Sequence, residues 1–237
     1  MASLLLAFGH SADQDGRWMR FTQQLGRWGQ PKLTVDNRPN TVFAEVQGSN
    51  EHFEFSGYLE GLEALLEKHG PQSRIFVFND SLFSHHSARR WAEFLKNYVP
   101  EHGPGVYGDP RTESLMVNGS PLRYLASWVF ILEGQVGQQA FKDALVQVLK
   151  NFNEAPTWPG YAEFLDHYYA TGRRFGGYTQ SLSGEDRERK LRCSWAEHRL
   201  SLLLAEQQML HPFTGLHYRA LHQFDRVLSA YKRLRDK

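Results

Sequence analysis

The stretch Arg74–Ser87, RIFVFNDSLFSHHS, decides how this sequence is interpreted. Four apolar residues, Ile75 to Phe78, run directly into Asn79, Asp80 and Ser81. A short apolar run of this kind predicts a buried strand. Two interpretations of its polar end are open. Asn, Asp and Ser are common in turns and helix caps, so the strand can simply end in a capped turn. Alternatively, Asp80 is held at a sheet edge to bind a ligand.

The sequence around this strand alternates between strand-like and helix-like patterns. Further β-prone runs are 3–8, 32–35, 41–46 and 125–132. Amphipathic helical runs are 17–28, 57–70, 87–99 and 138–149. Ser87 is the expected N-cap of the third of these helices. Strands that alternate with helices predict an α/β sheet covered by helices. Ligands of such sheets bind beyond the carboxyl ends of the strands, where Asp80 would lie.

The last third of the sequence has a different character, because strand signals fade after Thr157. Two long helical runs, 191–210 and 216–237, follow. The second has an apolar stripe made of Leu216, Ala220, Leu221, Phe224, Val227, Leu228, Tyr231 and Leu234. We therefore expect residues 1–150 to form an α/β domain and residues 151–237 a helical C-terminal extension.

Composition excludes several classes of protein. The chain has 237 residues, with 27 Lys and Arg against 26 Asp and Glu. This balance gives no electrostatic case for DNA, RNA or an anionic membrane as a bulk partner. A single cysteine, Cys193, excludes an internal disulfide and a cysteine-based zinc cluster, and it fits a reducing, cytoplasmic setting. The opening MASLLLAFG has no basic region before its apolar run, so it predicts a first strand rather than a signal peptide.

Several segments between Gly48 and Leu149 occur in the order of a known family. They read GSNEHFEFSGYLEGL, IFVFNDSLF, VYGDPRTES, LASWVFIL and AFKDALVQVL. In this order and spacing the chain resembles bacterial glycosyltransferases of the GT-A type, in particular the rhamnan-synthesis family. The resemblance implies a GT-A-like fold, a mixed sheet flanked by helices that binds a nucleotide-diphosphate sugar. It also implies transfer of that sugar to a glycan or lipid-linked glycan in cell-surface polysaccharide synthesis.

The resemblance places Asn79-Asp80-Ser81 where such enzymes usually have an Asp-x-Asp motif. Asp80 is then the expected ligand of Mn²⁺ or Mg²⁺, since these cations prefer hard oxygens and often bind one or two carboxylates plus substrate phosphates. Asn50 and Glu54 are expected near the nucleotide. The alternative for the segment that contains them, GSNEHFEFSGYLEGL, is an ordinary start of an amphipathic helix.

Many GT-A enzymes take a further metal ligand from a C-terminal histidine, and His211 or His217 is the candidate here. The alternative is a helix-turn-helix joint, broken by Pro212 and Gly215, in which these histidines are bystanders.

Asp109 or Glu113 is the candidate base that would deprotonate the acceptor hydroxyl. Arg111 is expected either to contact the diphosphate as a bidentate donor or to pair with Glu113 at the surface. The alternative interpretation of GDPRTES is a proline-containing turn with solvated charges.

A rival hypothesis comes from the single carboxylate of Asn79-Asp80-Ser81. The chain could be a non-catalytic interaction protein with a degenerate glycosyltransferase fold, whose C-terminal helices dock on a larger synthase. Convergence of Asp80, Asp109 and Glu113 on one cleft would favour the enzyme. The basic end 231–237, YKRLRDK, is typical of a solvated helix terminus, but it also suits peripheral association with an anionic membrane beside a lipid-linked acceptor.

Overall fold

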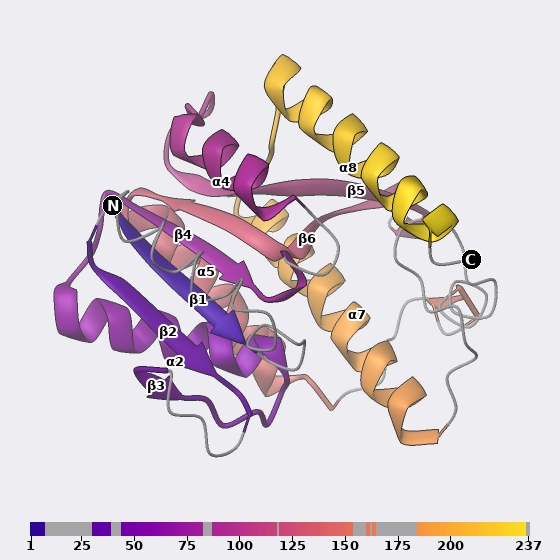
Figure 1. The fold of residues 1–237 in the computed structure, drawn as a ribbon. Helices are drawn as coiled ribbons and strands as arrows, with labels where there is room; N and C mark the ends of the chain where they lie inside the picture. The colour runs from indigo at the N-terminus through magenta and orange to yellow at the C-terminus, as the bar shows by residue number, and fades with distance from the viewer. Residues whose placement is uncertain are drawn as a thin grey trace.

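The computed structural model describes residues 1–7, 30–38, 44–82, 87–117, 119–153, 160–161, 163–164 and 184–235. Their strands form one seven-stranded sheet in the order β3-β2-β1-β4-β6-β5-β7 (Figure 1). The strands are β1 (Ala2–Ala7), β2 (Lys32–Asp36), β3 (Val46–Gln47), β4 (Arg74–Asn79), β5 (Gly105–Val117), β6 (Ser120–Glu133) and β7 (Leu210–Pro212). The helices are α2 (Glu54–His69), α4 (Ala88–Asn97), α5 (Gly134–Lys150), α7 (Gly184–Glu206) and α8 (Gly215–Arg235).

The sheet is mixed. β1 pairs in parallel with both β2 and β4, and β2 pairs in parallel with β3. β6 is antiparallel to both β4 and β5, and β7 is parallel to β5. Ala7 pairs with Asp36, and Leu6 pairs with Asn79. The ends of β2 and β4 therefore lie at the same level, on either side of the end of β1.

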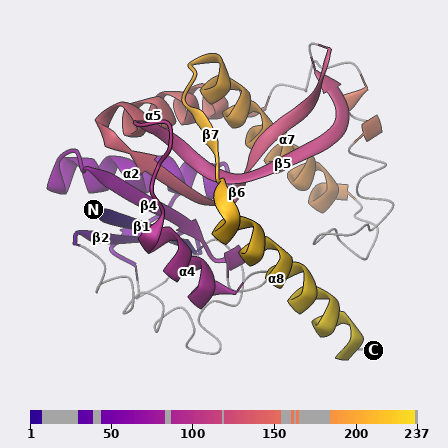
Figure 2. The ribbon, with the colours of Figure 1, turned by 90° about the horizontal axis from the view of Figure 1, so that it is seen from above.

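Helices cover both faces of the sheet, α2, α5 and α7 on one and α4 and α8 on the other (Figure 2), and each face has its own hydrophobic core. Ile75 and Val77 of β4 face the core that includes residues of α2, α5 and α7, whereas Phe76 and Phe78 face the core that includes residues of α4 and α8. Alternate side chains of a strand point to opposite faces, so a strand covered on both faces has a continuous apolar sequence. This is why IFVF predicted β4 correctly.

The expected fold class, a mixed α/β sheet flanked by helices with a helical C-terminal part, is confirmed. Of the predicted strand 41–46, residues 41–43 lie outside the described residues, and of 44–46 only Val46 belongs to a strand, β3. The predicted helix 17–28 and the two histidines that follow Asp80, His85 and His86, also lie outside them.

Two segments differ from their sequence interpretation. GDPRTES, for which a turn was one alternative, belongs to β5, and Pro110 sits where the pairing of β5 with β6 is irregular. Proline lacks the N–H that a regular ladder requires, so it is tolerated at such an irregularity. The expected helix-turn-helix joint contains instead β7, which pairs with β5 at the sheet edge. The division of the chain at residue 150 stays a prediction.

The close contact between α5 and β5 gives a first prediction. A Cβ at Gly137 would lie 2.4 Å from the carbonyl oxygen of Gly105, which is backbone and cannot rotate away. Gly137→Ala should therefore lower the free energy of unfolding by about 1–3 kcal/mol, although alanine is the better helix former. The neighbouring Val136→Ala is the control, because Val136 is exposed and should change stability by less than about 0.5 kcal/mol. Urea unfolding measures both, and equal stability of the two variants would contradict the prediction.

Candidate functional site

The polar end of β4 forms a capped turn. The side-chain oxygen of Asn79 accepts the backbone N–H of Ser81 at 3.0 Å, which closes an Asx turn around Asp80. Asp80 and Asn79 are both buried. The turn interpretation is therefore correct in geometry, and the same turn fixes Asp80 at the carboxyl edge of the parallel strands.

Glu54, the first residue of α2, lies near Asp80 and is also buried. Burial raises the pKa of the Glu54 carboxyl, the charge of Lys190 in α7 lowers it, and the charge of Asp80 raises it again. Arg189 of α7 lies above the ring of Phe53, with 4.5 Å between the guanidinium carbon and the ring centroid. Two carboxylates and the cationic side chains of α7 thus meet at one edge of the sheet.

Asn79 also helps to hold β6, which passes the end of β4 at Ser127. The Ser127 carbonyl accepts the Tyr58 hydroxyl at 2.5 Å and the Asn79 amide at 3.5 Å. The Ser127 N–H donates to the carboxylate of Glu197 in α7 at 2.5 Å. Three elements, α2, β4 and α7, therefore each supply one side chain that positions β6 beside Asp80.

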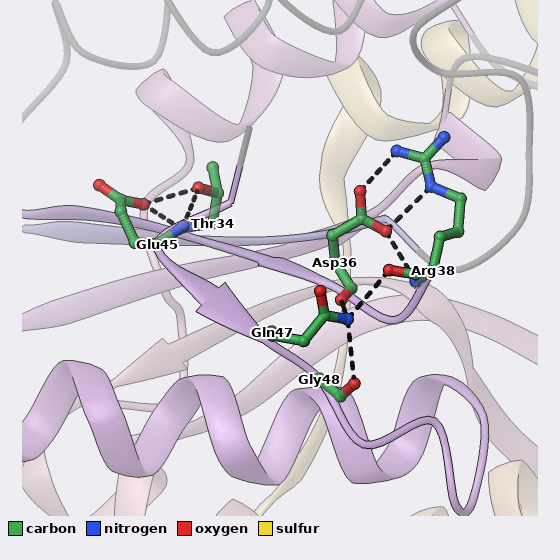
Figure 3. Close-up of polar contacts among 6 residues, drawn as sticks. All are labelled: Thr34, Asp36, Arg38, Glu45, Gln47 and Gly48. Carbon is green, nitrogen blue, oxygen red and sulfur yellow. Dashed lines mark hydrogen bonds and ion pairs between the residues drawn. The ribbon is translucent and has the colours of Figure 1, made fainter. Parts of the chain in front are cut away.

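The sequence interpretation missed a second polar strand end, Asp36-Asn37-Arg38 after β2. Asp36 is buried, and Arg38 donates to both of its carboxylate oxygens at 2.9 and 2.5 Å (Figure 3). The amide of Gln47 in β3 donates to the backbone carbonyls of Asp36 and Arg38. The signal was present, since KLTV followed by DNR repeats the pattern of IFVF followed by NDS. Asp, Asn and Pro are also typical of turns, so the pattern of 36–40 by itself does not distinguish a turn from a site.

The register relates the two acids. Asp36 pairs with Ala7 in β1, and Asn79 pairs with Leu6, so Asp36 and Asp80 stand one on each side of the end of β1. Two strand spacings place their Cα atoms about 10 Å apart. Parallel strands in α/β sheets commonly form ligand sites at this edge.

Asp109 lies elsewhere, on the face covered by α4 and α8. Its buried carboxylate accepts Arg111 at 2.6 Å, the Trp128 indole N–H at 3.2 Å and the Tyr218 hydroxyl at 2.7 Å. Burial and the Asp109 charge raise the pKa of Tyr218, so this hydroxyl remains a donor. Arg111 pairs with Asp109 rather than with Glu113, the surface partner considered for it.

Glu113 lies four positions after Asp109 in β5, where the pairing with β6 is irregular. It accepts the Tyr124 hydroxyl at 3.2 Å, and burial raises the pKa of its carboxyl. Asn50 is exposed in the loop before α2, with a left-handed φ of 57°. Asp109 accepts the Tyr218 hydroxyl of α8 and Glu113 accepts the Tyr124 hydroxyl of β6, and Arg111 interacts with both acids: it pairs with Asp109, and its charge lowers the pKa of Glu113 against the larger effect of burial.

His211 lies in β7, where it pairs with Tyr107, and its ring centroid is 5.2 Å from that of His102. β5 and β6 separate β7 from β4, so the two strands are about 14 Å apart and His211 is not brought to Asp80. His217 is exposed on α8. Over the described ranges, no group of three or more His, Cys, Asp or Glu side chains is arranged to hold a metal ion.

Comparison with known proteins gives similarity only at the level of solved structures. No protein-family model and no curated protein matches the chain. A 4-diphosphocytidyl-2C-methyl-D-erythritol synthase is 13% identical, with a TM-score of 0.37, over 81% of this chain and 96% of that one. The bifunctional IspDF from Campylobacter jejuni is 11% identical, with a TM-score of 0.36, over 78% of this chain and 50% of that one. Membership of the rhamnan-synthesis family stays a prediction, and function has to be inferred from the site itself.

The buried carboxyl of Glu54 gives a prediction about pH. Its pKa lies above the ordinary value of 4.5, so the folded protein binds more protons than the unfolded chain as the pH rises from that value. This group therefore makes the free energy of unfolding fall as the pH rises from 4.5 through the pKa of the folded-state carboxyl. Glu54→Gln cannot titrate, and urea unfolding from about pH 4.5 to about pH 8 should show a smaller fall than in the wild type.

Glu67→Gln, an exposed residue of the same helix, is the matched control and should keep the wild-type pH dependence. An unchanged slope in Glu54→Gln would mean that this carboxyl is not desolvated in solution.

Proposed function

We propose that the protein is a glycosyltransferase that binds a nucleotide-diphosphate sugar at the carboxyl edge of β1, β2 and β4. The acceptor is a glycan or lipid-linked glycan, and the setting is cytoplasmic synthesis of cell-surface polysaccharide. One observation supports this proposal above the others: Asp36 and Asp80 flank the end of β1, and Glu54 lies beside Asp80. The crevice at such an edge is where open α/β sheets bind nucleotides.

Asp80 and Glu54 fit a divalent cation by their chemistry. Both offer hard carboxylate oxygens, and their mutual repulsion contributes to the raised pKa of Glu54. Two carboxylates suffice where the remaining ligands are substrate phosphates. A bound Mn²⁺ or Mg²⁺ would stabilise the charge that develops on the departing nucleoside diphosphate.

The protein's own groups orient the donor in this proposal. Asn79 and Ser81 hold the turn that carries Asp80, and Asn50 borders the start of α2. Lys190 and Arg189 supply positive charge to the same edge from α7. Arg111 would have to leave its ion pair with Asp109 before it could contact a diphosphate.

Glu113 is the better candidate for the base. A general base needs an available lone pair and a pKa closer to the working pH than that of an ordinary carboxyl. Burial raises the pKa of the Glu113 carboxyl, which accepts a hydrogen bond from the Tyr124 hydroxyl. Asp109 already accepts three donors, so proton transfer to it would disrupt the anchor of α8.

A second candidate function, a non-catalytic partner with the same fold, is favoured by the separation of His211 from Asp80 and by the three donors that already occupy the Asp109 carboxylate. A chain of this kind would bind nucleotide without turning over a donor, or would bind no nucleotide.

A thermal-shift screen tests donor binding. UDP, GDP, CDP and dTDP are each added with and without Mn²⁺ to the wild type and to Asp80→Asn, which preserves shape and removes the charge. We expect one nucleotide to raise the melting temperature in the presence of Mn²⁺, because a ligand that binds only the folded state stabilises it. At a concentration of 100 Kd the stabilisation is about 2.7 kcal/mol, and it should be lost in Asp80→Asn.

Asp109→Asn is the control for a buried carboxylate outside the site. It should retain the nucleotide shift even where its own stability is lower, since Asp109 contacts Tyr218 and Trp128 rather than the β4 edge. If no nucleotide shifts the wild type, or if both variants respond like the wild type, the site has been placed wrongly.

Glu113→Gln tests the base. With the donor identified by the screen, the release of nucleoside diphosphate in the presence of glycan acceptor should fall by about 10²–10⁴-fold, because general base catalysis contributes that much. The thermal shift with nucleotide should be unchanged, since Glu113 is assigned to the acceptor side. A loss of nucleotide binding together with activity would assign Glu113 to the donor instead.

A further inference from the structure

The inner side of α8 is fixed to the body of the protein by polar contacts. The Asp225 carboxylate accepts the Trp91 indole N–H at 2.6 Å and the backbone N–H of Ser87 at 3.1 Å. The Tyr218 hydroxyl binds Asp109, and Leu221 is buried. Asp225 is the only acidic residue between Gly215 and Leu228, and it is turned inward.

The outer side of α8 has the opposite composition. Leu216 is 78% exposed and Val227 is 66% exposed, and Ala220 is exposed between them. Residues spaced by four and then seven positions lie along one side of a helix. Arg219, Gln223 and Arg226 are exposed on the same side. The apolar stripe expected from the sequence is therefore wider than the side that packs on the protein.

This combination of exposed leucine and valine with arginine, and with no acid, is complementary to an anionic lipid surface. An amphipathic helix can lie in the plane of the interface with its apolar side chains inserted, while cations contact the headgroups. The sequence after Leu228 adds four basic residues and one acid. No described helix is long and apolar enough to cross a membrane, so the contact would be peripheral.

We infer that the outer side of α8, defined by Leu216, Arg219, Ala220, Arg226 and Val227, docks on an anionic lipid surface. Figure 2 shows α8 running alongside α4 and projecting beyond it. Asp225 binds Ser87 and Trp91 at the start of α4, and the Trp91 ring packs on Trp128 of β6, the strand that passes the end of β4. The purpose of the docking rests on the proposed function: a lipid-linked acceptor in that surface would lie beside the donor.

Vesicle co-sedimentation of the full chain tests the inference. Vesicles of phosphatidylcholine alone are compared with vesicles that contain an equal share of phosphatidylglycerol. We expect binding to the anionic vesicles that weakens with salt. The double variant Leu216→Gln/Val227→Gln should lower the partition coefficient by at least tenfold. Arg219→Gln and Arg226→Gln should each lower it by about fivefold, the equivalent of about 1 kcal/mol per cation.

The matched control is Val136→Gln/Val146→Gln, which removes two exposed valines from α5 on the other face of the sheet and should bind vesicles like the wild type. Each variant is also tested in the nucleotide thermal-shift assay, which the α8 substitutions should leave unchanged. No vesicle binding, or equal loss in the α5 control, would overturn the inference. So would self-association in sedimentation velocity that the α8 substitutions abolish, because a second copy would then cover this side. Vesicle binding without any nucleotide shift would keep the docking and refute the proposed function.

Discussion

The structure depends on how β6 passes the end of β4. Phe130 pairs with Gly108 and Leu125 pairs with Pro110, so the residues 126–129 of β6 stand opposite Asp109 alone. The backbone groups of such a bulge lose their ladder partners, and unmade hydrogen bonds cost free energy in a partly buried setting. Here Tyr58, Asn79 and Glu197 bind Ser127 instead. One irregular segment thus ties α2, β4 and α7 to the same point.

The bulge also organises the opposite face. Trp128, which lies within it, donates its indole N–H to Asp109, and Tyr218 of α8 donates to the other oxygen of that carboxylate. Buried carboxylates with several donors are structural anchors, since removal of any donor leaves a charge uncompensated. This distinguishes Asp109 from Glu54, whose pKa is raised by burial and by a neighbouring acid. Asp109 and Glu54 are both buried carboxylic acids, but the groups around each one give them different roles.

Sequence reasoning predicted elements whose own pattern decides their structure. IFVF is apolar throughout because both faces of β4 are covered, and α2, α4 and α5 have clear helical periodicity. It did not predict β7, because three residues, Leu210–Pro212, become a strand only through pairing with β5. The Ser87 cap was also misjudged in detail: its side chain makes no cap bond, while its N–H binds Asp225 of α8. The contact between Asp109 and Tyr218 spans 109 positions, and no local pattern encodes such a distance.

The candidate site depends on the C-terminal part as much as on the strands. α7 brings Lys190 and Arg189 to the start of α2, so two cationic side chains face the carboxylates of Glu54 and Asp80. Asp36 has its own partner in Arg38. Glu197 of α7, whose carboxyl pKa is raised by burial, adds a fourth acid to these three cations. Under the proposed function, a nucleotide-diphosphate sugar would therefore be expected to bind together with a divalent cation, because the cation offsets the charge of the diphosphate, whereas a diphosphate alone would face an excess of carboxylates.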